Sequence, residues 1–340
     1  MIKHIILLGF ILIILQAQAF QNMNAFVYHR FGDDRYPSTN IDIDKFEAHL
    51  KYLQENDYEV ITMDEVVQRL NKKRDKDAKI AVLTIDDAYK SFYENALPLL
   101  QQYDFPATIY VNTETVGFGD FMTWEELKDA ETKGIEIGNH SHAHSYFLNE
   151  EIDFFVADLK ESESLFEQNL GNVPKTFAYP YGEWNLDMAY VLDTANYTSA
   201  VAQNSGVIGK LSNRFYLPRF PMSNAYAGLD KFIEKLTVKS MQNFEIEVIK
   251  SGYMGSPIKP RLILRFAPAS YEVRSVQGFI QGAKIRKTLE VIKDGVIKLT
   301  MWPDSDLTRR RTLFTVTARD DKGQWHWFSY LYVIPELTEN

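Results

Sequence analysis

The sequence predicts two folded units, an α/β unit built on a parallel sheet or barrel and an all-β unit that follows it. Two observations support this prediction. From residue 20 to about 235, short apolar runs alternate with helical patterns, as is typical of parallel α/β folds. From Asn243 onward, about seven short strand patterns follow one another in roughly a hundred residues without a good helix, as is typical of a β-sandwich. We therefore place the two domains at residues 20–235 and 240–340.

The elements of the first domain follow from the spacing of its apolar residues. The helix at residues 44–55, for example, carries Phe46, His49, Leu50 and Leu53 on one stripe, so we expect all four to pack inward. The predicted strands lie at residues 25–28, 60–62, 79–85, 107–111, 135–138 and 176–179, and the predicted helices at 44–55, 64–70, 91–103, 124 onward and 151–168.

Two local signals refine these helices. Thr123, with Glu126 three positions later, forms a capping-box pattern, so a helix is expected to begin at Trp124. Pro98 lies inside the helix predicted at residues 91–103, and it is expected to kink that helix.

The second domain contains strand patterns separated by turn signals. Asp294-Gly295 and Lys322-Gly323 predict hairpin turns. Residues 325–333 are apolar on both faces, which favours a covered central strand over a sugar-binding platform. This domain is interpreted as carbohydrate-binding or structural. Examples of its predicted strands lie at residues 245–249, 261–266, 289–292, 296–301, 313–318 and 325–333.

The first nineteen residues resemble a secretory signal peptide. Lys3 and His4 form a short basic start, residues 5–15 are apolar, and Ala17-Gln18-Ala19 is a small-x-small cleavage site. The apolar run is short for a bilayer span, and no other stretch is long and apolar enough to cross a membrane. We expect cleavage after Ala19, a periplasmic or extracellular location, and no stable membrane span once the signal is removed.

Composition excludes several classes of function. The net charge of -9 argues against a nucleic acid partner, because phosphate binding needs clustered Lys and Arg. The chain has no cysteine, which excludes cysteine nucleophiles and cysteine-based zinc sites. Any metal must therefore be held by histidines and carboxylates.

Ionisable residues gather just after three of the predicted strands, where α/β folds place their sites. Asp86 and Asp87 are adjacent carboxylates, and their side chains point in different directions, so one can bind a metal while the other acts on a water. His140, His142 and His144 follow another strand within five residues. His140 and His144 are four apart, which on a helical turn places both imidazoles on one face.

Together, two of these histidines and one aspartate make a three-ligand metal site with open positions for water and substrate. That arrangement is typical of catalytic rather than structural zinc. A metal there would polarise a carbonyl and lower the pKa of a water, and the second aspartate is placed to act as a base. His142 is an alternative ligand to His144.

These residues resemble the signatures of the polysaccharide deacetylase family, the family 4 carbohydrate esterases. Thr84-Ile85-Asp86-Asp87 is similar to the family's Thr-Phe-Asp-Asp, and the segment from His140 to His144 is similar to its His-Ser/Thr-x-x-His. The resemblance implies a distorted (β/α) barrel over residues 20–235. It also implies that Asp86 is the general base and that Asp87, His140 and His144 are the metal ligands. Because imidazole is the commonest protein ligand for zinc, we expect the metal to be Zn2+, with Co2+ or Ni2+ as alternatives.

The chain departs from the family pattern at two places. The third signature, Arg-x-Pro-Tyr/Phe-Gly, stands here as Ala178-Tyr179-Pro180-Tyr181-Gly182, so its arginine is missing, and Arg219 is a candidate substitute that could also bind substrate. In the family, the backbone N–H of the signature's Tyr/Phe helps to stabilise the oxyanion that forms during the reaction, and the resemblance assigns this role to Tyr181. The late Leu-x-His signature is absent.

The start of the chain, Val27-Tyr28-His29-Arg30, resembles the biofilm poly-N-acetylglucosamine deacetylases, in which an early Tyr-His lies at the active site. The resemblance to this branch implies that His29 is the catalytic acid. Trp184 follows the third signature, and it is a candidate for the wall of the acetyl pocket, although ordinary loop packing explains it equally well.

The predicted reaction is the removal of N-acetyl groups from an acetylated polysaccharide, such as poly-N-acetylglucosamine or another hexosamine glycan. Two alternatives remain open. One is an esterase of the same fold that removes O-acetyl groups, and the other is a non-catalytic glycan-binding protein.

Overall fold

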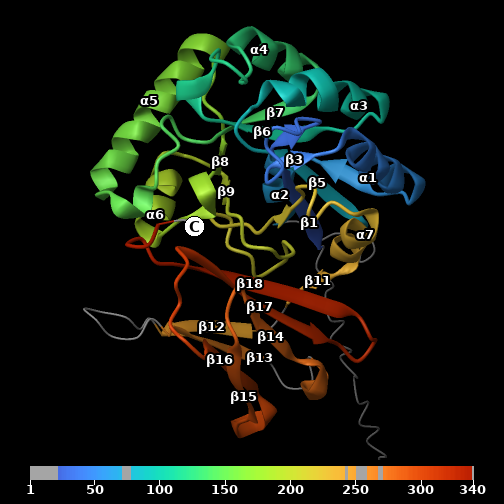
Figure 1. Cartoon of the computed structure of the whole chain (residues 1–340), viewed down its shortest axis with the longest axis vertical. Coiled ribbons are helices and arrows are strands. Elements are labelled where there is room, and N and C mark those ends of the chain that lie inside the picture. The colour runs from blue at the N-terminus through green and yellow to red at the C-terminus, as the bar shows by residue number, and fades with distance from the viewer. Residues whose placement is uncertain (1–21, 71–77, 242–243, 250–258, 267–270, 339–340) are drawn as a thin grey trace, which may run out of the picture.

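The computed structural model describes residues 22–70, 78–241, 244–249, 259–266 and 271–338. The predicted signal segment, residues 1–19, lies outside the described residues. The chain forms an α/β unit, drawn at the top of Figure 1, and a pair of β-sheets below it. The change from one to the other falls between helix α7 (Leu229–Thr237) and strand β11 (Lys239–Ser240).

The α/β unit is built on one all-parallel sheet that curves into an open barrel, as the sequence predicts. Its strand order is β10-β1-β5-β6-β7-β8-β9, and β4 pairs with the first half of β5. The strands are β1 (Met23–Tyr28), β4 (Glu59–Ile61), β5 (Ile80–Ile85), β6 (Ala107–Val111), β7 (Ile135–Asn139), β8 (Thr176–Ala178), β9 (Ser199–Val201) and β10 (Phe220–Pro221).

Helices cover the outside of this sheet (Figure 1). They are α1 (Ile43–Glu55), α2 (Met63–Leu70), α3 (Leu97–Gln102), α4 (Trp124–Thr132), α5 (Ile152–Leu170), α6 (Leu186–Thr194) and α7. The capping box predicted for α4 is present in both directions between Thr123 and Glu126. The helix predicted at residues 91–103 is instead a π-turn, Phe92–Ala96, followed by α3, because Pro98 has no N–H to continue the helical hydrogen bonding of the preceding turn.

The C-terminal unit is a β-sandwich, as predicted. One sheet has the order β11-β18-β17-β14 and the other β12-β13-β16-β15, and their buried inner faces form one apolar core. Asp294 and Gly295 both have positive φ at the turn between β15 and β16, as the Asp-Gly signal predicts. The remaining strands are β12 (Phe244–Ile249), β13 (Arg261–Phe266), β14 (Gln277–Ile280), β15 (Ile285–Val291), β16 (Ile297–Pro303), β17 (Arg311–Arg319) and β18 (Trp325–Val333), and the short β2 (Arg30–Phe31) and β3 (Asn40–Ile41) pair beside the barrel.

The sandwich is fastened to the loops at the site end of the barrel. Arg310 makes a buried ion pair with Glu183 at 2.7 and 2.8 Å, and the Trp327 Nε1–H donates to the carbonyl of Ser205 at 3.1 Å. Strand β18 therefore has one face in the sandwich core and the other against the barrel, as expected of a covered strand. In the part of the chain that the structure describes, no helix is long and apolar enough to cross a membrane.

Candidate active site

The predicted site residues come together at the carboxyl ends of neighbouring parallel strands. His29 directly follows β1, and Asp86 and Asp87 directly follow β5, which pairs with β1 along its whole length. The Asp86 N–H continues this pairing by donating to the carbonyl of Tyr28 at 2.9 Å. His140 follows β7, two strands further along the sheet.

Asp87, His140 and His144 form a cluster whose possible ligand atoms all lie within 4.8 Å of one another. The Nε2 atoms of His140 and His144 each lie 3.4 Å from Oδ1 of Asp87. Ligands about 2.1 Å from a tetrahedral zinc ion lie about 3.4 Å apart, so these separations fit such an ion. Asp87 and His144 both have positive φ, 71° and 49°, which side chains adopt at a cost and which is common at functional sites.

The backbone fixes the tautomer of His140. Its Nδ1 lies 2.7 Å from the carbonyl oxygen of Ala178, and because a carbonyl only accepts, Nδ1 must carry the proton. The Nε2 atom of His140 is thereby directed at the cluster, where its lone pair can bind a metal once Nε2 has lost its proton, as in metal sites whose histidines are oriented by a second hydrogen bond.

Asp158 on α5 holds the histidine loop in place. Its two carboxylate oxygens accept the N–H groups of His142 and Ala143, each at 2.8 Å. The Ser141 hydroxyl also accepts the N–H of His144 at 3.0 Å. Sequence reasoning did not single out Asp158, although a buried aspartate between Phe155 and Leu159 on an apolar helix face was a usable signal.

His142 turns away from the cluster. Its Nδ1 lies 2.9 Å from the hydroxyl of Thr113, and it is not grouped with the three possible ligands among the described residues. Of the two ligand choices that the sequence left open, the structure brings together the outer pair, His140 and His144.

Asp86 is paired with Arg219 in the interior. The Arg219 guanidinium donates to both Asp86 oxygens, at 2.7 and 2.8 Å, and both side chains are fully buried. It also donates to Thr84 in the strand that precedes Asp86. The structure thus places Arg219, the candidate substitute for the missing motif arginine, on the carboxylate of the predicted base, and its burial favours a role in orienting that carboxylate over direct substrate binding.

Both carboxylates are held in the ionised form. Burial by itself would raise the pKa of Asp86, but the charges of Arg219 and His140 hold that pKa below its usual range. Burial likewise opposes ionisation of Asp87, yet the hydrogen bond from His140 and the nearby histidine charges keep the Asp87 pKa well below its usual range. The Asp87 carboxylate is therefore available as an anionic metal ligand.

His29 lies beside this pair of carboxylates. Its positive charge, when it is protonated, lowers the pKa of both Asp86 and Asp87 and of His144. It is half-buried. The fold therefore brings His29 to the site although it lies more than fifty positions from Asp86 in the sequence.

Tyr181 packs beside the metal-ligand cluster, against His144. It has φ 59° inside the Pro180–Gly182 turn, its ring stacks on Tyr146 at 3.9 Å, and its edge meets His144 at 4.6 Å. Its carbonyl oxygen accepts a hydrogen bond from Arg311 of the sandwich at 2.8 Å. Sequence reasoning missed Arg311, because nothing local links it to a residue 130 positions away.

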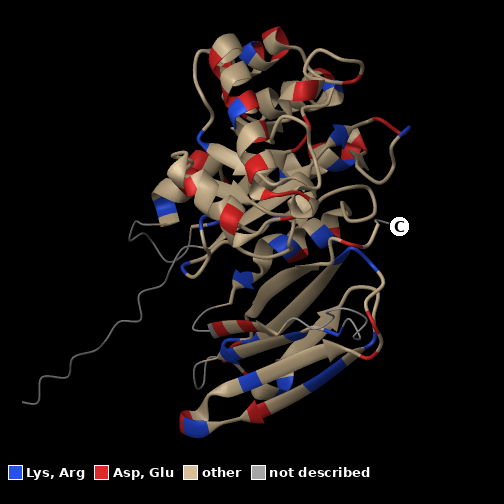
Figure 2. Ribbon diagram, turned by 90° about the vertical axis from the view of Figure 1, so that its left-hand side faces the viewer, with Lys and Arg blue, Asp and Glu red and all other residues tan. Residues whose placement is uncertain are grey.

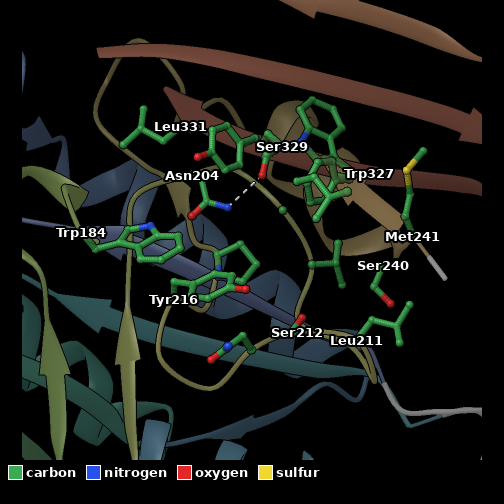
Figure 3. A pocket seen from close by; sticks show the side chains of 17 residues that line it. Trp184, Asn204, Leu211, Ser212, Tyr216, Ser240, Met241, Trp327, Ser329 and Leu331 are labelled. Carbon is green, nitrogen blue, oxygen red and sulfur yellow. Dashed lines mark hydrogen bonds between the residues drawn. The ribbon is translucent and has the colours of Figure 1, made fainter. Parts of the chain in front are cut away.

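Trp184 lies in a different pocket, between the barrel and β18 (Figure 3). Its indole stacks on Tyr216 with ring centroids 4.0 Å apart, and Asn204, Ser329 and Leu331 lie around them. The structure does not group Trp184 with the metal cluster.

Comparison with known proteins agrees with this geometry. Residues 73–200, which include Asp86, Asp87 and the histidine loop, match the family model described as polysaccharide deacetylase. Over these residues the barrel is similar to the polysaccharide deacetylase family. The expected resemblance to this family and the expectation of a deacetylase enzyme are both confirmed.

Curated relatives share much of this deacetylase domain. A Staphylococcus aureus poly-β-1,6-N-acetyl-D-glucosamine N-deacetylase is 29% identical over 217 aligned positions, and the match covers 59% of this chain and 74% of the relative. The Bacillus subtilis protein YxkH, named as a polysaccharide deacetylase, is 25% identical over 202 residues, 59% of this chain and 72% of that protein. These relatives support the predicted resemblance to the biofilm branch.

Solved structures share the fold. The Streptococcus pyogenes deacetylase PplD superposes with a TM-score of 0.60 at 21% identity, covering 64% of this chain and 99% of that one. IcaB from Ammonifex degensii gives a TM-score of 0.56 at 21% identity, covering 63% and 97%. The deacetylase-type barrel predicted from the sequence is confirmed.

Proposed function

We propose that this chain is an exported, metal-dependent hydrolase that removes N-acetyl groups from a hexosamine polysaccharide such as poly-N-acetylglucosamine. The observation that carries the proposal is the Asp87, His140 and His144 cluster beside the buried Asp86–Arg219 pair. The relatives that are named as poly-β-1,6-N-acetyl-D-glucosamine N-deacetylases support the choice of substrate.

The donor set suits a divalent transition metal. Two imidazole nitrogens and one carboxylate oxygen favour Zn2+, with Co2+ or Ni2+ as alternatives, and leave room for water and substrate. When bound, such an ion supplies a Lewis acid that polarises the acetyl carbonyl and lowers the pKa of a water.

In the proposed mechanism, Asp86 takes a proton from the attacking water, and Arg219 keeps its carboxylate oriented and ionised. The N–H of Tyr181 donates to the oxyanion that forms on the acetyl carbonyl. His29 protonates the leaving nitrogen as the C–N bond breaks, so one amide and one water give one amine and one acetate.

Export rests on the sequence of the first nineteen residues. A basic start, an apolar run and the Ala17-Gln18-Ala19 site together favour cleavage and release outside the cytoplasm. The proposed substrate of the exported enzyme is therefore an acetylated glycan outside the membrane.

The test is an acetate-release panel across defined glycans, with the protein loaded with zinc, cobalt or nickel. We expect acetate from N-acetylglucosamine oligomers and little from O-acetylated xylan. Faster release from the O-acetylated polymer would make the protein an esterase of the same fold. Release from neither, with tight glycan binding retained, would make it a binding protein.

A further inference from the structure

A trough begins at the catalytic residues and runs along the junction of the two units. At its near end it is lined by Tyr181 and by Gln203, whose side chain donates to Asp86 at 3.4 Å. One wall comes from the barrel, and the other comes from the sandwich through Gln281, Arg309 and Arg311. The active site thus opens onto a surface that the C-terminal unit completes.

Strand alternation explains which sandwich residues face this trough. In β17, Phe314 and Val316 lie in the sandwich core, so Thr315 and Thr317 lie on the opposite, outer face. Register places Phe279 of β14 directly across from Thr315. Figure 1 shows this sheet nearer to the barrel and the second sheet on the far side.

The trough continues past its first section. A second hollow, lined by Phe279, Thr315 and Trp325, shares Glu234 and Trp327 with the first, so the two hollows adjoin at these residues. Phe279 is 53% exposed and Trp325 is 38% exposed, although both are large apolar side chains. Exposed aromatic faces suit the C–H faces of a sugar chain.

The near section is positively charged. Arg309, Arg311, Lys231 and Lys235 line it together with a single carboxylate, Glu234. The sandwich is also the basic part of an acidic chain, since residues 241–340 hold 15 Lys and Arg against 11 Asp and Glu, while residues 1–240 hold 22 against 35. Lys and Arg are the blue segments along the sandwich strands in Figure 2. A glycan unit with a free, protonated amine would meet like charge here.

We propose that this trough is an extended glycan-binding groove, in which the sandwich holds several sugar units beside the scissile one and selects units that carry no free amine. The proposal rests on the proposed function, because it takes the glycan substrate as its occupant. Continuity with Tyr181 and Gln203 argues for this occupant, since Gln203 lines the trough and also contacts Asp86.

Steady-state kinetics on fully acetylated oligomers of two to six units test the groove. We expect KM to fall about tenfold from the dimer to the hexamer. Phe279→Ala and Trp325→Ala should remove most of that difference, while Val291→Ala, an exposed site on the far sheet, should keep it. Equal KM values for dimer and hexamer, or aromatic variants that behave like Val291→Ala, would overturn the proposal.

Charge selection is tested with hexamers that are acetylated at one unit only. Wild-type protein should bind these several-fold more weakly than the fully acetylated hexamer, and Arg309→Glu should shrink that gap. An unchanged gap in Arg309→Glu would contradict the role of the basic section.

A binding measurement separates this proposal from the proposed function. Titration calorimetry measures the affinity of the fully acetylated hexamer for the Asp86→Asn variant and for the Asp86→Asn, Phe279→Ala double variant. Because Asp86→Asn prevents turnover, the measurement reports binding in the groove alone. If wild type releases no acetate from any glycan, the proposed function fails. Weaker binding in the double variant would still support the groove, and unchanged binding would remove it.

Discussion

The Asp86–Arg219 pair is the most consequential contact at the scale of single residues. Two oppositely charged groups without solvent exposure depend on each other, because either one alone would be a buried, uncompensated charge. The paired hydrogen bonds also fix the direction of the Asp86 carboxylate, which a point charge on a flexible chain would not do.

Arg219→Ala should lower the free energy of unfolding by about 3–5 kcal/mol, because it leaves Asp86 charged and unpaired in the interior. Arg219→Lys keeps the positive charge but loses the paired hydrogen bonds of the guanidinium. It should therefore lower the free energy of unfolding by less than Arg219→Ala does, and still lower kcat by at least about tenfold. Urea unfolding and acetate release measure the two effects. Wild-type turnover in Arg219→Lys would show that orientation of Asp86 is unimportant.

The two outer histidines of the loop should behave differently from the middle one. His144→Ala should lose bound zinc, because it removes one of three possible ligands, while His142→Ala should keep it, because His142 faces Thr113. Metal content of the purified variants decides between them. Zinc lost from His142→Ala and retained by His144→Ala would reverse the ligand assignment.

At the scale of elements, α1 is locked to α7 and β1 through His49. Its ring stacks on Phe232 at 3.9 Å, its Nε2–H donates to the Ala227 carbonyl, and its Nδ1 accepts from the Tyr28 hydroxyl. These contacts confirm the packing role that the apolar stripe predicts. They need the neutral imidazole, and burial lowers the pKa of His49 from 6.5 to about 4.

This pKa predicts acid destabilisation. Because the folded state binds the proton less tightly than the unfolded chain, the contribution is fully present above pH 6.5 and is lost as the pH falls toward 4. The loss is about 1.4 kcal/mol for each pH unit in that window. His49→Gln should flatten the dependence, as measured by urea unfolding at pH 7 and pH 4.5. An equal pH effect in both proteins would assign the acid sensitivity to other groups.

The elements also show what sequence patterns can and cannot reveal. Long periodic segments such as α1 and β5 were predictable within a residue or two, and so was the histidine loop, since its chemistry is local. α6 was missed because Leu186 and Tyr190 are 74% and 70% exposed, so its apolar residues form no single stripe. β14 was missed because Gly278 interrupts its alternation.

At the scale of the molecule, the two units share the active-site end of the barrel. Arg310 ties the sandwich to Glu183, and Arg311 ties it to Tyr181. No local pattern could predict these contacts, because each joins residues more than a hundred positions apart. The sequence alone left open whether the sandwich is carbohydrate-binding or structural, and these contacts favour a unit that also supports the site.

Arg310→Ala should lower the free energy of unfolding by about 3–5 kcal/mol, because it leaves the buried carboxylate of Glu183 without its ion-pair partner at the junction of the two units. Arg309→Ala, the exposed neighbour, should change stability by less than about 0.5 kcal/mol. Differential scanning calorimetry should show a single transition in wild type and Arg309→Ala. Identical melting of Arg310→Ala and wild type would mean that the junction carries little energy.

We propose that Asp87, His140 and His144 form the metal centre of an N-deacetylase. Zinc titration of chelator-treated protein tests this directly, with acetate release from N-acetylglucosamine oligomers as the readout. We predict that activity is absent without metal, rises to a plateau at one zinc per chain, and stays flat in His144→Ala. Acetate release that ignores the chelator, or an equal plateau in His144→Ala, would contradict the claim.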